Sequence, residues 1–243
     1  MHVLITRPKD DAEPLKSQIE QLGWRTSLEP LISVVAEPIS PAALANAATL
    51  IVTSRNALRS LAASPALQHA VTLPLLTVGP GTASLAREMG FQRIFEGPGT
   101  GAGLVPEITR RATSRGEPFL YLSGDILAFD LPAALAEKKI NVQRVIAYRS
   151  VAAETLSPAT TNALEKREID IVALMSPRTA RTWTRLTAKL AARADLAGVT
   201  YVCLSENVAS AIKGVMPAPA ILTAARPNLE ELFIVLKRLA ARP

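Results

Sequence analysis

The sequence predicts an α/β protein with two parallel β-sheets, each covered by helices on both faces. Short apolar runs alternate along the whole chain with segments of 3.6-residue apolar periodicity, which is typical of strand–helix–strand units. Ten candidate strands are too many for one small open sheet and suit two sheets of about five. At 243 residues the chain is long enough for two domains of ordinary size.

The expected strands are short apolar runs that end at turn-forming or small polar residues. They are 2–6, 25–29, 50–53, 75–78, 93–96, 119–122, 142–146, 171–175, 201–204 and 220–223. Helices are expected between them, among others at 10–22, 127–139 and 228–240. The last of these carries leucines and a phenylalanine at helical spacing, as a helix packed on a sheet requires.

An internal repeat supports two copies of one α/β unit. The similar segment pairs are 3–7 with 119–124, 33–36 with 150–153, 50–57 with 172–180, and 77–84 with 203–210. Ser33 and Ser150, in the second pair, are 117 positions apart. Chance likeness among apolar strands is the alternative interpretation.

Composition narrows the class of protein. A hydrophobic content of 49% and a mean hydropathy of +0.22 argue against disorder, yet no apolar run reaches the roughly 18 residues of a membrane span. The N-terminal apolar segment is too short for a signal peptide. The single cysteine, Cys203, allows no intramolecular disulfide, and two histidines, His2 and His69, argue against a metal site. We expect a cytoplasmic protein without metal.

The net charge of +6 permits an anionic partner. Residues 36–149 hold 11 Lys and Arg against 8 Asp and Glu, and the remainder holds 16 against 13. This even distribution favours a small anion that both domains contact over a basic nucleic-acid-binding tail. Aromatic residues make up only 4% and no basic run is interleaved with them, which also argues against nucleic acid. Ordinary solvated arginines are the alternative.

Candidate ligand-binding residues follow the strands, because ligands of open parallel sheets bind beyond the carboxyl ends of the strands. Small hydroxyl residues, glycines and arginines gather there, and a guanidinium group binds carboxylates through two hydrogen bonds. The candidates are Arg7, Thr53, Ser54, Arg55, Gly79, Thr82, Ser123, Gly124, Ser176, Arg178, Ser205 and Asn207. Helix capping by Ser, Thr and Asn is the alternative interpretation.

The glycine-rich segments 79–84 and 97–103 only partly match a dinucleotide-binding fingerprint. Ser84 replaces the last glycine of the first segment, and the second contains a proline and no matching lysine. Tight strand-to-helix turns explain both segments better, so no cofactor is expected. We expect Cys203 to be a core residue, and neither histidine to act as a general base.

Six motifs in order together resemble the uroporphyrinogen-III synthase family over essentially the whole chain. They are VLITRP at 3–8, LIVTSRNA at 50–57, LTVGPGTA at 76–83, YLSG at 121–124, VIAYR at 145–149 and ALMSPRT at 173–179. The resemblance implies two flavodoxin-like domains, one inserted into the other. Domain one would comprise 1–35 and 150–243, domain two 36–149, with paired linker strands near 31–37 and 147–153.

The resemblance also implies an activity. Enzymes of this family close the linear tetrapyrrole hydroxymethylbilane, which carries eight carboxylates, with inversion of ring D and loss of water, and use no cofactor. Tyr148 matches the tyrosine proposed to assist departure of the hydroxyl, and Thr82 matches a substrate-binding position. The other strand-end candidates would hold the carboxylates. A tyrosine that merely fills a strand position is the alternative for Tyr148.

The loop at 205–209 departs from the family, which often has glycine where this chain has Ser205. Glu206 would repel a polyanion unless it were turned away. We expect a monomer that binds a small-molecule substrate and contacts no nucleic acid or membrane; a transient contact with the preceding enzyme of the pathway is also compatible. The rival functions are a non-enzymatic two-lobed anion-binding protein and a nucleotide-dependent oxidoreductase.

Overall fold

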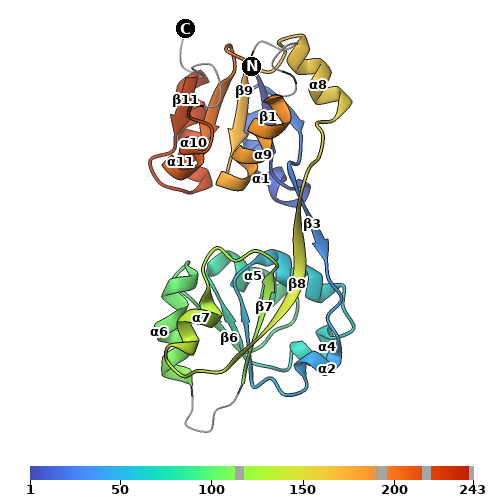
Figure 1. The fold of residues 1–243 in the computed structure, drawn as a ribbon, viewed down its shortest axis with the longest axis vertical. Helices are drawn as coiled ribbons and strands as arrows, with labels where there is room; N and C mark the ends of the chain where they lie inside the picture. The colour runs from blue at the N-terminus through green and yellow to red at the C-terminus, as the bar shows by residue number, and fades with distance from the viewer. Residues whose placement is uncertain (113–117, 189, 191–195, 215–219, 241–243) are drawn as a thin grey trace. The chain divides into compact units, whose positions relative to one another are not determined.

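The computed structural model describes residues 1–112, 118–188, 190, 196–214 and 220–240 and is drawn in Figure 1. The chain divides into two units: unit 1 comprises Met1–Ser33 and Val151–Pro243, and unit 2 comprises Val34–Ser150. The sequence-based divisions were at 35/36 and 149/150. The chain passes between the units within strands β3 (Ile32–Ala36) and β8 (Val142–Ala152), which are neighbours in one sheet.

Unit 1 is built on a parallel sheet with the strand order β2-β1-β9-β10-β11, the order of flavodoxin-like folds. Its strands are β1 (His2–Ile5), β2 (Arg25–Leu28), β9 (Ile171–Leu174), β10 (Thr200–Cys203) and β11 (Ala220–Thr223). Helices α1 (Lys9–Glu20) and α11 (Leu229–Ala240) pack on one face. Helices α8 (Pro158–Glu165), α9 (Pro177–Ala188) and α10 (Glu206–Ser210) pack on the other.

Unit 2 is built on a sheet with the order β3-β8-β7-β4-β5-β6, in which the strands from β4 to β8 pair in parallel. The strands not yet given are β4 (Thr49–Val52), β5 (Leu75–Thr77), β6 (Ile94–Glu96) and β7 (Phe119–Gly124). One face carries α2 (Pro41–Leu44), α3 (Arg55–Ala62), α4 (Leu67–Ala70) and α5 (Pro80–Glu88). The other carries α6 (Gly101–Arg111) and α7 (Leu131–Ala136).

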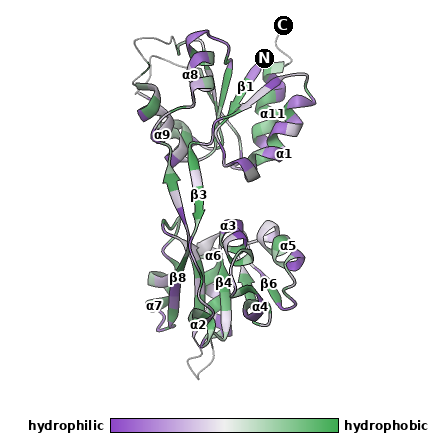
Figure 2. Cartoon of the chain, turned by 90° about the vertical axis from the view of Figure 1, so that its right-hand side faces the viewer, coloured by the Kyte–Doolittle hydropathy of each residue, from purple (hydrophilic) through white to green (hydrophobic). Residues whose placement is uncertain are grey.

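The central strands are buried on both sides, because each sheet lies between two layers of helices. Every residue of β1, β7 and β9 is buried. Figure 2 shows β1 and β4 in the colour of hydrophobic residues, while the helices carry their polar residues on one side. Near-continuous apolar runs are typical of such strands, and they explain why the sequence predicted them.

The two sheets are circular permutations of one arrangement. The order β8-β7-β4-β5-β6 of unit 2 repeats the order β2-β1-β9-β10-β11 of unit 1, although the chain runs through the strands from a different starting point. The register agrees: His2 lies opposite Arg25, and Phe119, 117 positions after His2, lies opposite Val142, 117 positions after Arg25. The internal repeat predicted from the sequence is confirmed.

All ten predicted strands are present, and two elements differ from expectation. Strand β8 continues without interruption to Ala152, so the predicted strand 142–146 and the linker strand are one. The helix predicted at 127–139 begins only at Leu131, because the Asp130 side chain accepts the Ala133 backbone N–H and caps it there. None of the helices in the described part of the chain is long and apolar enough to cross a membrane.

Candidate functional site

The serines predicted at two strand ends both cap helices. The Ser54 Oγ accepts the Asn56 N–H at 3.1 Å at the start of α3. The Ser176 Oγ accepts the Thr179 N–H at 3.0 Å at the start of α9, in the matching position of unit 1. Capping therefore accounts for both serines without a ligand, and their role in binding stays a prediction.

Gly79 and Ser205 occupy matching N-cap positions, those of α5 and α10, and neither forms a side-chain cap. A Cβ at Gly79 would lie 3.2 Å from the Gly99 Cα, so a side chain there would press on the neighbouring loop. Glu206, which follows Ser205, forms an ion pair with Lys213. The predicted repulsion of an anion by Glu206 is therefore partly neutralised within α10 and its C-terminal turn.

The strand-end arginines differ in how they are held. Arg7 lies 3.9 Å from the Asp11 carboxylate, one helical turn away. The Arg226 Nε donates to Glu231 at 2.8 Å, and this hydrogen bond raises the pKa of Arg226. Arg55, at the start of α3, is exposed. Arg226 and Arg7 thus each have an acidic partner within unit 1, and contact of Arg7 and Arg55 with an anionic ligand stays a prediction.

A cavity of about 400 Å³ opens in unit 2 at the carboxyl ends of β4, β5 and β7. Strands β4 and β7 are neighbours whose following connections lead to opposite sides of the sheet, and such a switch point is where α/β sheets bind ligands. Among the predicted binding residues, all of which the structure describes, Thr53 is the one that lines this cavity. The lining is Thr53, Val78, Gly99, Thr100, Gly101, Ala102, Tyr121, Ala128, Phe129 and Leu131.

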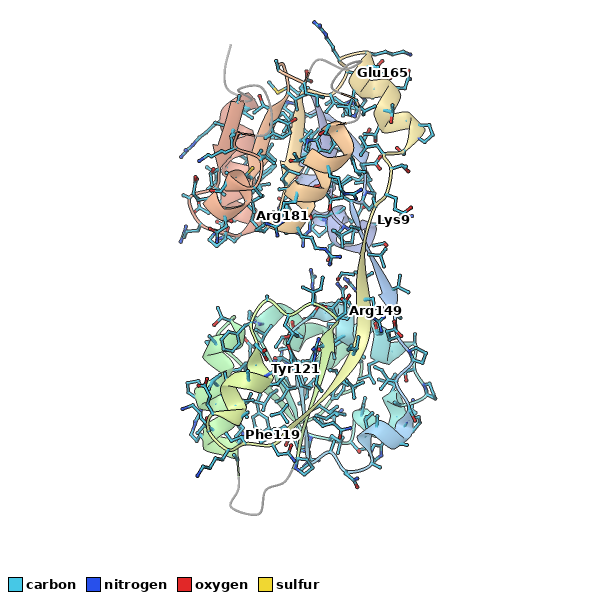
Figure 3. The ribbon with its side chains drawn as sticks, in the orientation of Figure 1. Lys9, Phe119, Tyr121, Arg149, Glu165 and Arg181 are labelled. Carbon is cyan, nitrogen blue, oxygen red and sulfur yellow. The ribbon has the colours of Figure 1, made fainter. Side chains whose placement is uncertain are left out.

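Tyr121 is a polar residue of this cavity that the sequence analysis missed. Its hydroxyl lies 2.7 Å from the Thr53 Oγ1, and burial raises its pKa although the Thr53 hydrogen bond opposes the shift. Figure 3 labels Tyr121 on β7, two residues after Phe119 and on the same face of the sheet. Tyr121 belongs to the YLSG motif, but its place within an apolar strand predicted only a core residue.

Tyr148 lies on β8 and is half-buried against the core under α2 to α5. Its ring packs over Gly124, where an added Cβ would lie 2.7 Å from the ring Cζ. Thr82, in α5, is buried with 6% exposure. Unit 2 therefore brings Tyr148 and Gly124 into contact, and joins Thr53 to Tyr121.

Neither the cysteine nor the histidines line this cavity. Cys203 is fully buried in β10, where burial and then the nearby Glu206 raise its pKa to about 12; the prediction of a core residue is confirmed. His2 is buried in β1 with its Nε2 2.7 Å from the Ser27 Oγ, and burial lowers its pKa. His69 lies on the short helix α4. The described residues contain no group of three His, Cys, Asp or Glu that could hold a metal ion.

The family profile described as uroporphyrinogen-III synthase HemD matches residues 13–234. The chain belongs to the uroporphyrinogen-III synthase family. This family comprises lyases that cyclise hydroxymethylbilane, so the chain is an enzyme acting on a small-molecule tetrapyrrole. The non-enzymatic anion-binding alternative is not favoured.

Two solved structures have the same fold. The uroporphyrinogen-III synthetase of Helicobacter pylori is 18% identical, with a TM-score of 0.67 over 98% of this chain and 99% of that chain. A mutant uroporphyrinogen III synthase of Thermus thermophilus is 19% identical, with a TM-score of 0.55 over 98% of both chains. No curated protein matches this chain in sequence. At these identities the structures support the fold, and the family profile supports the activity.

Proposed function

We propose that this chain converts hydroxymethylbilane into uroporphyrinogen III, with inversion of ring D and loss of water, as a cytoplasmic monomer that needs no cofactor. The single observation that carries the proposal is the family match over residues 13–234. Residues 36–149 and the remainder of the chain each have an excess of basic over acidic residues of the same size, which supports a substrate with eight carboxylates.

The reaction depends mainly on geometry. The electron-rich pyrrole expels the hydroxyl of its hydroxymethyl group and becomes an azafulvene, which closes spontaneously to the isomer without inversion. The enzyme must direct the substituted carbon of ring D to attack, giving a spiro intermediate that fragments and recloses. Holding two reacting carbons in the required orientation is a large source of rate and selectivity by itself.

We assign the departure of the hydroxyl to Tyr148. Its phenol would donate a proton to the leaving oxygen, so that the C–O bond breaks, water leaves and a phenolate remains. The resulting cation then transfers its pyrrole N–H proton to the phenolate, which restores the phenol. General acid catalysis of this kind contributes roughly 10²–10⁴-fold to rates. The half-buried phenol over Gly124 supports this role, because partial burial leaves an edge for the substrate.

Binding of the acetate and propionate groups is proposed for the strand-end residues of each unit. Guanidinium groups supply paired donors, and hydroxyls and helix N-termini supply single ones. The proposed set is Arg7, Thr53, Ser54, Arg55, Gly79, Thr82, Ser123, Gly124, Ser176, Arg178, Ser205 and Asn207.

The direct assay supplies hydroxymethylbilane to the purified protein, oxidises the product and separates isomers I and III by chromatography. We expect isomer III, formed faster than the spontaneous reaction without protein. Isomer I alone, at the spontaneous rate, contradicts the proposal. Urea-unfolded protein is the control for non-specific effects, and binding of the substrate without turnover indicates the rival anion-binding function. Sedimentation at several concentrations tests the monomer.

A further inference from the structure

We infer that Gly124, Asp125 and Arg144 are positioning residues that fix the Tyr148 side chain by way of a β-bulge in β8. The inference rests on the proposed function only in giving the Tyr148 hydroxyl a catalytic task. The local geometry does not depend on this catalytic task, because it consists of contacts within unit 2, which holds all four residues.

The β7–β8 ladder contains one extra residue immediately before Tyr148. Ser123 lies opposite Ile146, but the next residue of β7, Gly124, lies opposite Tyr148, so Ala147 has no counterpart. An extra residue of this kind is a β-bulge, which shifts the alternation of side chains by one position.

The bulge decides which face of the sheet receives the tyrosine. Val145 and Ala147 point to the core under α2 to α5, as strict alternation requires. Tyr148 follows Ala147 directly, yet it packs against this same core. Without the bulge, alternation would place Tyr148 on the opposite face, the face of Ile146.

Gly124 supplies the space that the re-aimed ring occupies. A Cβ on Gly124 would lie 2.7 Å from the Tyr148 Cζ, 2.8 Å from its Cε2 and 2.8 Å from its hydroxyl oxygen. These separations are far below van der Waals contact, so any side chain at this position forces the phenol to move. The requirement is for space rather than for an unusual backbone angle.

Arg144 fixes the end of β7, where Gly124 lies, and the residue that follows it. Its Nε donates to the Ser123 Oγ at 2.8 Å, and its Nη2 donates to the carbonyls of Gly124 at 2.7 Å and Asp125 at 2.8 Å. Charged donors form stronger hydrogen bonds than neutral ones, and the planar guanidinium sets their directions. A lysine in this place could satisfy one or two of these acceptors without the same geometry.

Asp125, the first residue of the loop after β7, ties this loop to β8 at the tyrosine and two residues after it. Its N–H donates to the Tyr148 carbonyl at 3.0 Å, and its Oδ1 accepts the Ser150 N–H at 3.0 Å. The backbone that carries Tyr148 is therefore held by the loop that Arg144 holds. Together these contacts give the phenol one position over Gly124.

Unit 1 provides an internal comparison. The strand registers match at an offset of 117 residues, and the same offset carried past the end of the β1–β2 register places Arg7 where unit 2 has Gly124, and Leu31 where it has Tyr148. Leu31 is fully buried. The unit without the tyrosine thus also lacks the glycine, as expected if the glycine is needed for the tyrosine.

The first test observes Tyr148 without any substrate. The chain has three tyrosines, so protein labelled with 3-fluorotyrosine gives a fluorine NMR spectrum whose lines can be assigned by changing each tyrosine to phenylalanine. We expect Gly124→Ala to shift the Tyr148 line and to leave the Tyr201 line in place. Gly198→Ala, at a glycine whose Cβ would meet nothing within 4 Å, is the matched control and should move neither line. An unmoved Tyr148 line in folded Gly124→Ala overturns the inference, whether or not the protein is a synthase.

The second test uses turnover. We expect Gly124→Ala to lower kcat about tenfold with KM changed by less than about twofold, because the phenol moves while alanine keeps the backbone that position 124 would offer to a carboxylate. In a Tyr148→Phe background the same change should cost less than about twofold, since coupled residues are not additive. Equal losses in both backgrounds overturn the inference. A moved Tyr148 line with full turnover supports the positioning and contradicts the catalytic role proposed for Tyr148.

Arg144 keeps the inference testable if Gly124→Ala does not fold. We expect Arg144→Met to shift the Tyr148 line and to lower kcat, and Arg144→Lys to restore each only in part. A lysine keeps the positive charge, so full recovery of kcat and of the Tyr148 line in Arg144→Lys overturns the positioning role in favour of a general charge effect.

Discussion

Units 1 and 2 share one strand order but differ in what they place at the strand ends. Nine of the twelve glycines lie in unit 2; among them, Gly99 and Gly101 line the cavity and Gly124 lies under Tyr148. Unit 1 holds Cys203 and Trp183, both fully buried, the partly buried Trp24, and a buried carboxylate, Glu29. A duplicated framework therefore does not duplicate chemistry, because loops can change while the sheet keeps its register.

The largest effect is expected at Glu29, which accepts hydrogen bonds from residues at the start of α8 in unit 1. Its carboxylate accepts the Ser157 N–H at 3.1 Å, the Ser157 hydroxyl at 2.6 Å and the Thr160 hydroxyl. Glu29→Ala leaves these buried donors unsatisfied, so the free energy of unfolding of unit 1 should fall by about 3 kcal/mol. Urea unfolding followed by fluorescence of Trp24 and Trp183 reports unit 1 alone, since unit 2 has no tryptophan.

The control for Glu29 is a partly exposed carboxylate of unit 2. Glu37 accepts the Arg149 Nε at 2.6 Å near the surface, and such pairs contribute about 0–1 kcal/mol. Glu37→Ala should leave the tryptophan transition almost unchanged. If the free energy of unfolding falls no further in Glu29→Ala than in Glu37→Ala, the buried Glu29 carboxylate is not what stabilises unit 1.

The next-largest effect is a loss of stability when alanine replaces a closely packed glycine of unit 2, compared with a glycine of unit 1 that has open space around it. A Cβ at Gly97 would lie 2.5 Å from the Leu104 Cδ2 and 2.7 Å from the Thr77 carbonyl oxygen, so Gly97→Ala should destabilise unit 2 by about 2 kcal/mol. Gly198→Ala in unit 1 has open space around the new methyl and should change stability by less than about 1 kcal/mol. Far-UV circular dichroism in urea measures both. Equal effects would mean that the glycines of unit 2 are not there for close packing.

Tyr148 should matter for turnover, whereas a tyrosine of unit 1 should not. Tyr148→Phe removes the proposed proton donor, and we expect turnover to fall by more than about tenfold. Tyr201, buried in β10, accepts the Trp183 Nε1–H at 3.3 Å, and Tyr201→Phe should keep turnover within about twofold if the fold is intact. The isomer assay measures both variants, and unchanged turnover in folded Tyr148→Phe makes this tyrosine a structural residue.

The matching caps Ser54 and Ser176 test how far the two units are equivalent. Each serine accepts one N–H at a helix start, so each alanine variant should lose about 1 kcal/mol in the free energy of unfolding. Urea titration of single and double variants measures the losses. Strongly unequal losses would indicate that one serine has a task besides capping.

The smallest effect is a pH dependence in unit 1. Burial lowers the pKa of His2, so below its ordinary value of about 6.5 the unfolded chain binds the proton first. The free energy of unfolding should therefore fall, by less than about 1 kcal/mol, as pH decreases from about 6.5 through the lowered pKa. His2→Gln should remove this slope. Phe119, the counterpart of His2 in unit 2, has no titratable group. A pH dependence of the free energy of unfolding that persists in His2→Gln must therefore come from another residue.

The sequence predicted the strands well and the site only in part. Strands such as 50–53 can be recognised in the sequence as apolar runs, because both of their faces are buried. The 117-residue spacing of Ser33 and Ser150 likewise indicated the internal repeat. The bulge at Ala147 could not be predicted, since it depends on pairing with a distant strand. Glu29 and Tyr121 were missed because the burial of a polar side chain beside a distant hydrogen-bond partner leaves no local pattern in the sequence. The permuted strand order was also not predicted, since it too depends on which distant strands pair.

The insertion of unit 2 into unit 1 has a consequence for synthesis on the ribosome. Strands β1 and β2 emerge first, but β9, the neighbour of β1 at the centre of their sheet, ends only at Leu174. At about 5–20 residues per second, the first two strands wait on the order of 10 s, while all of Val34–Ser150 emerges and can fold. While Val34–Ser150 emerges, α1, which packs on β1 and β2, is the one helix of the described part of unit 1 that has already been made. The nascent chain thus carries an exposed, incomplete sheet of unit 1 after unit 2 has been made, and a chaperone can bind to this sheet.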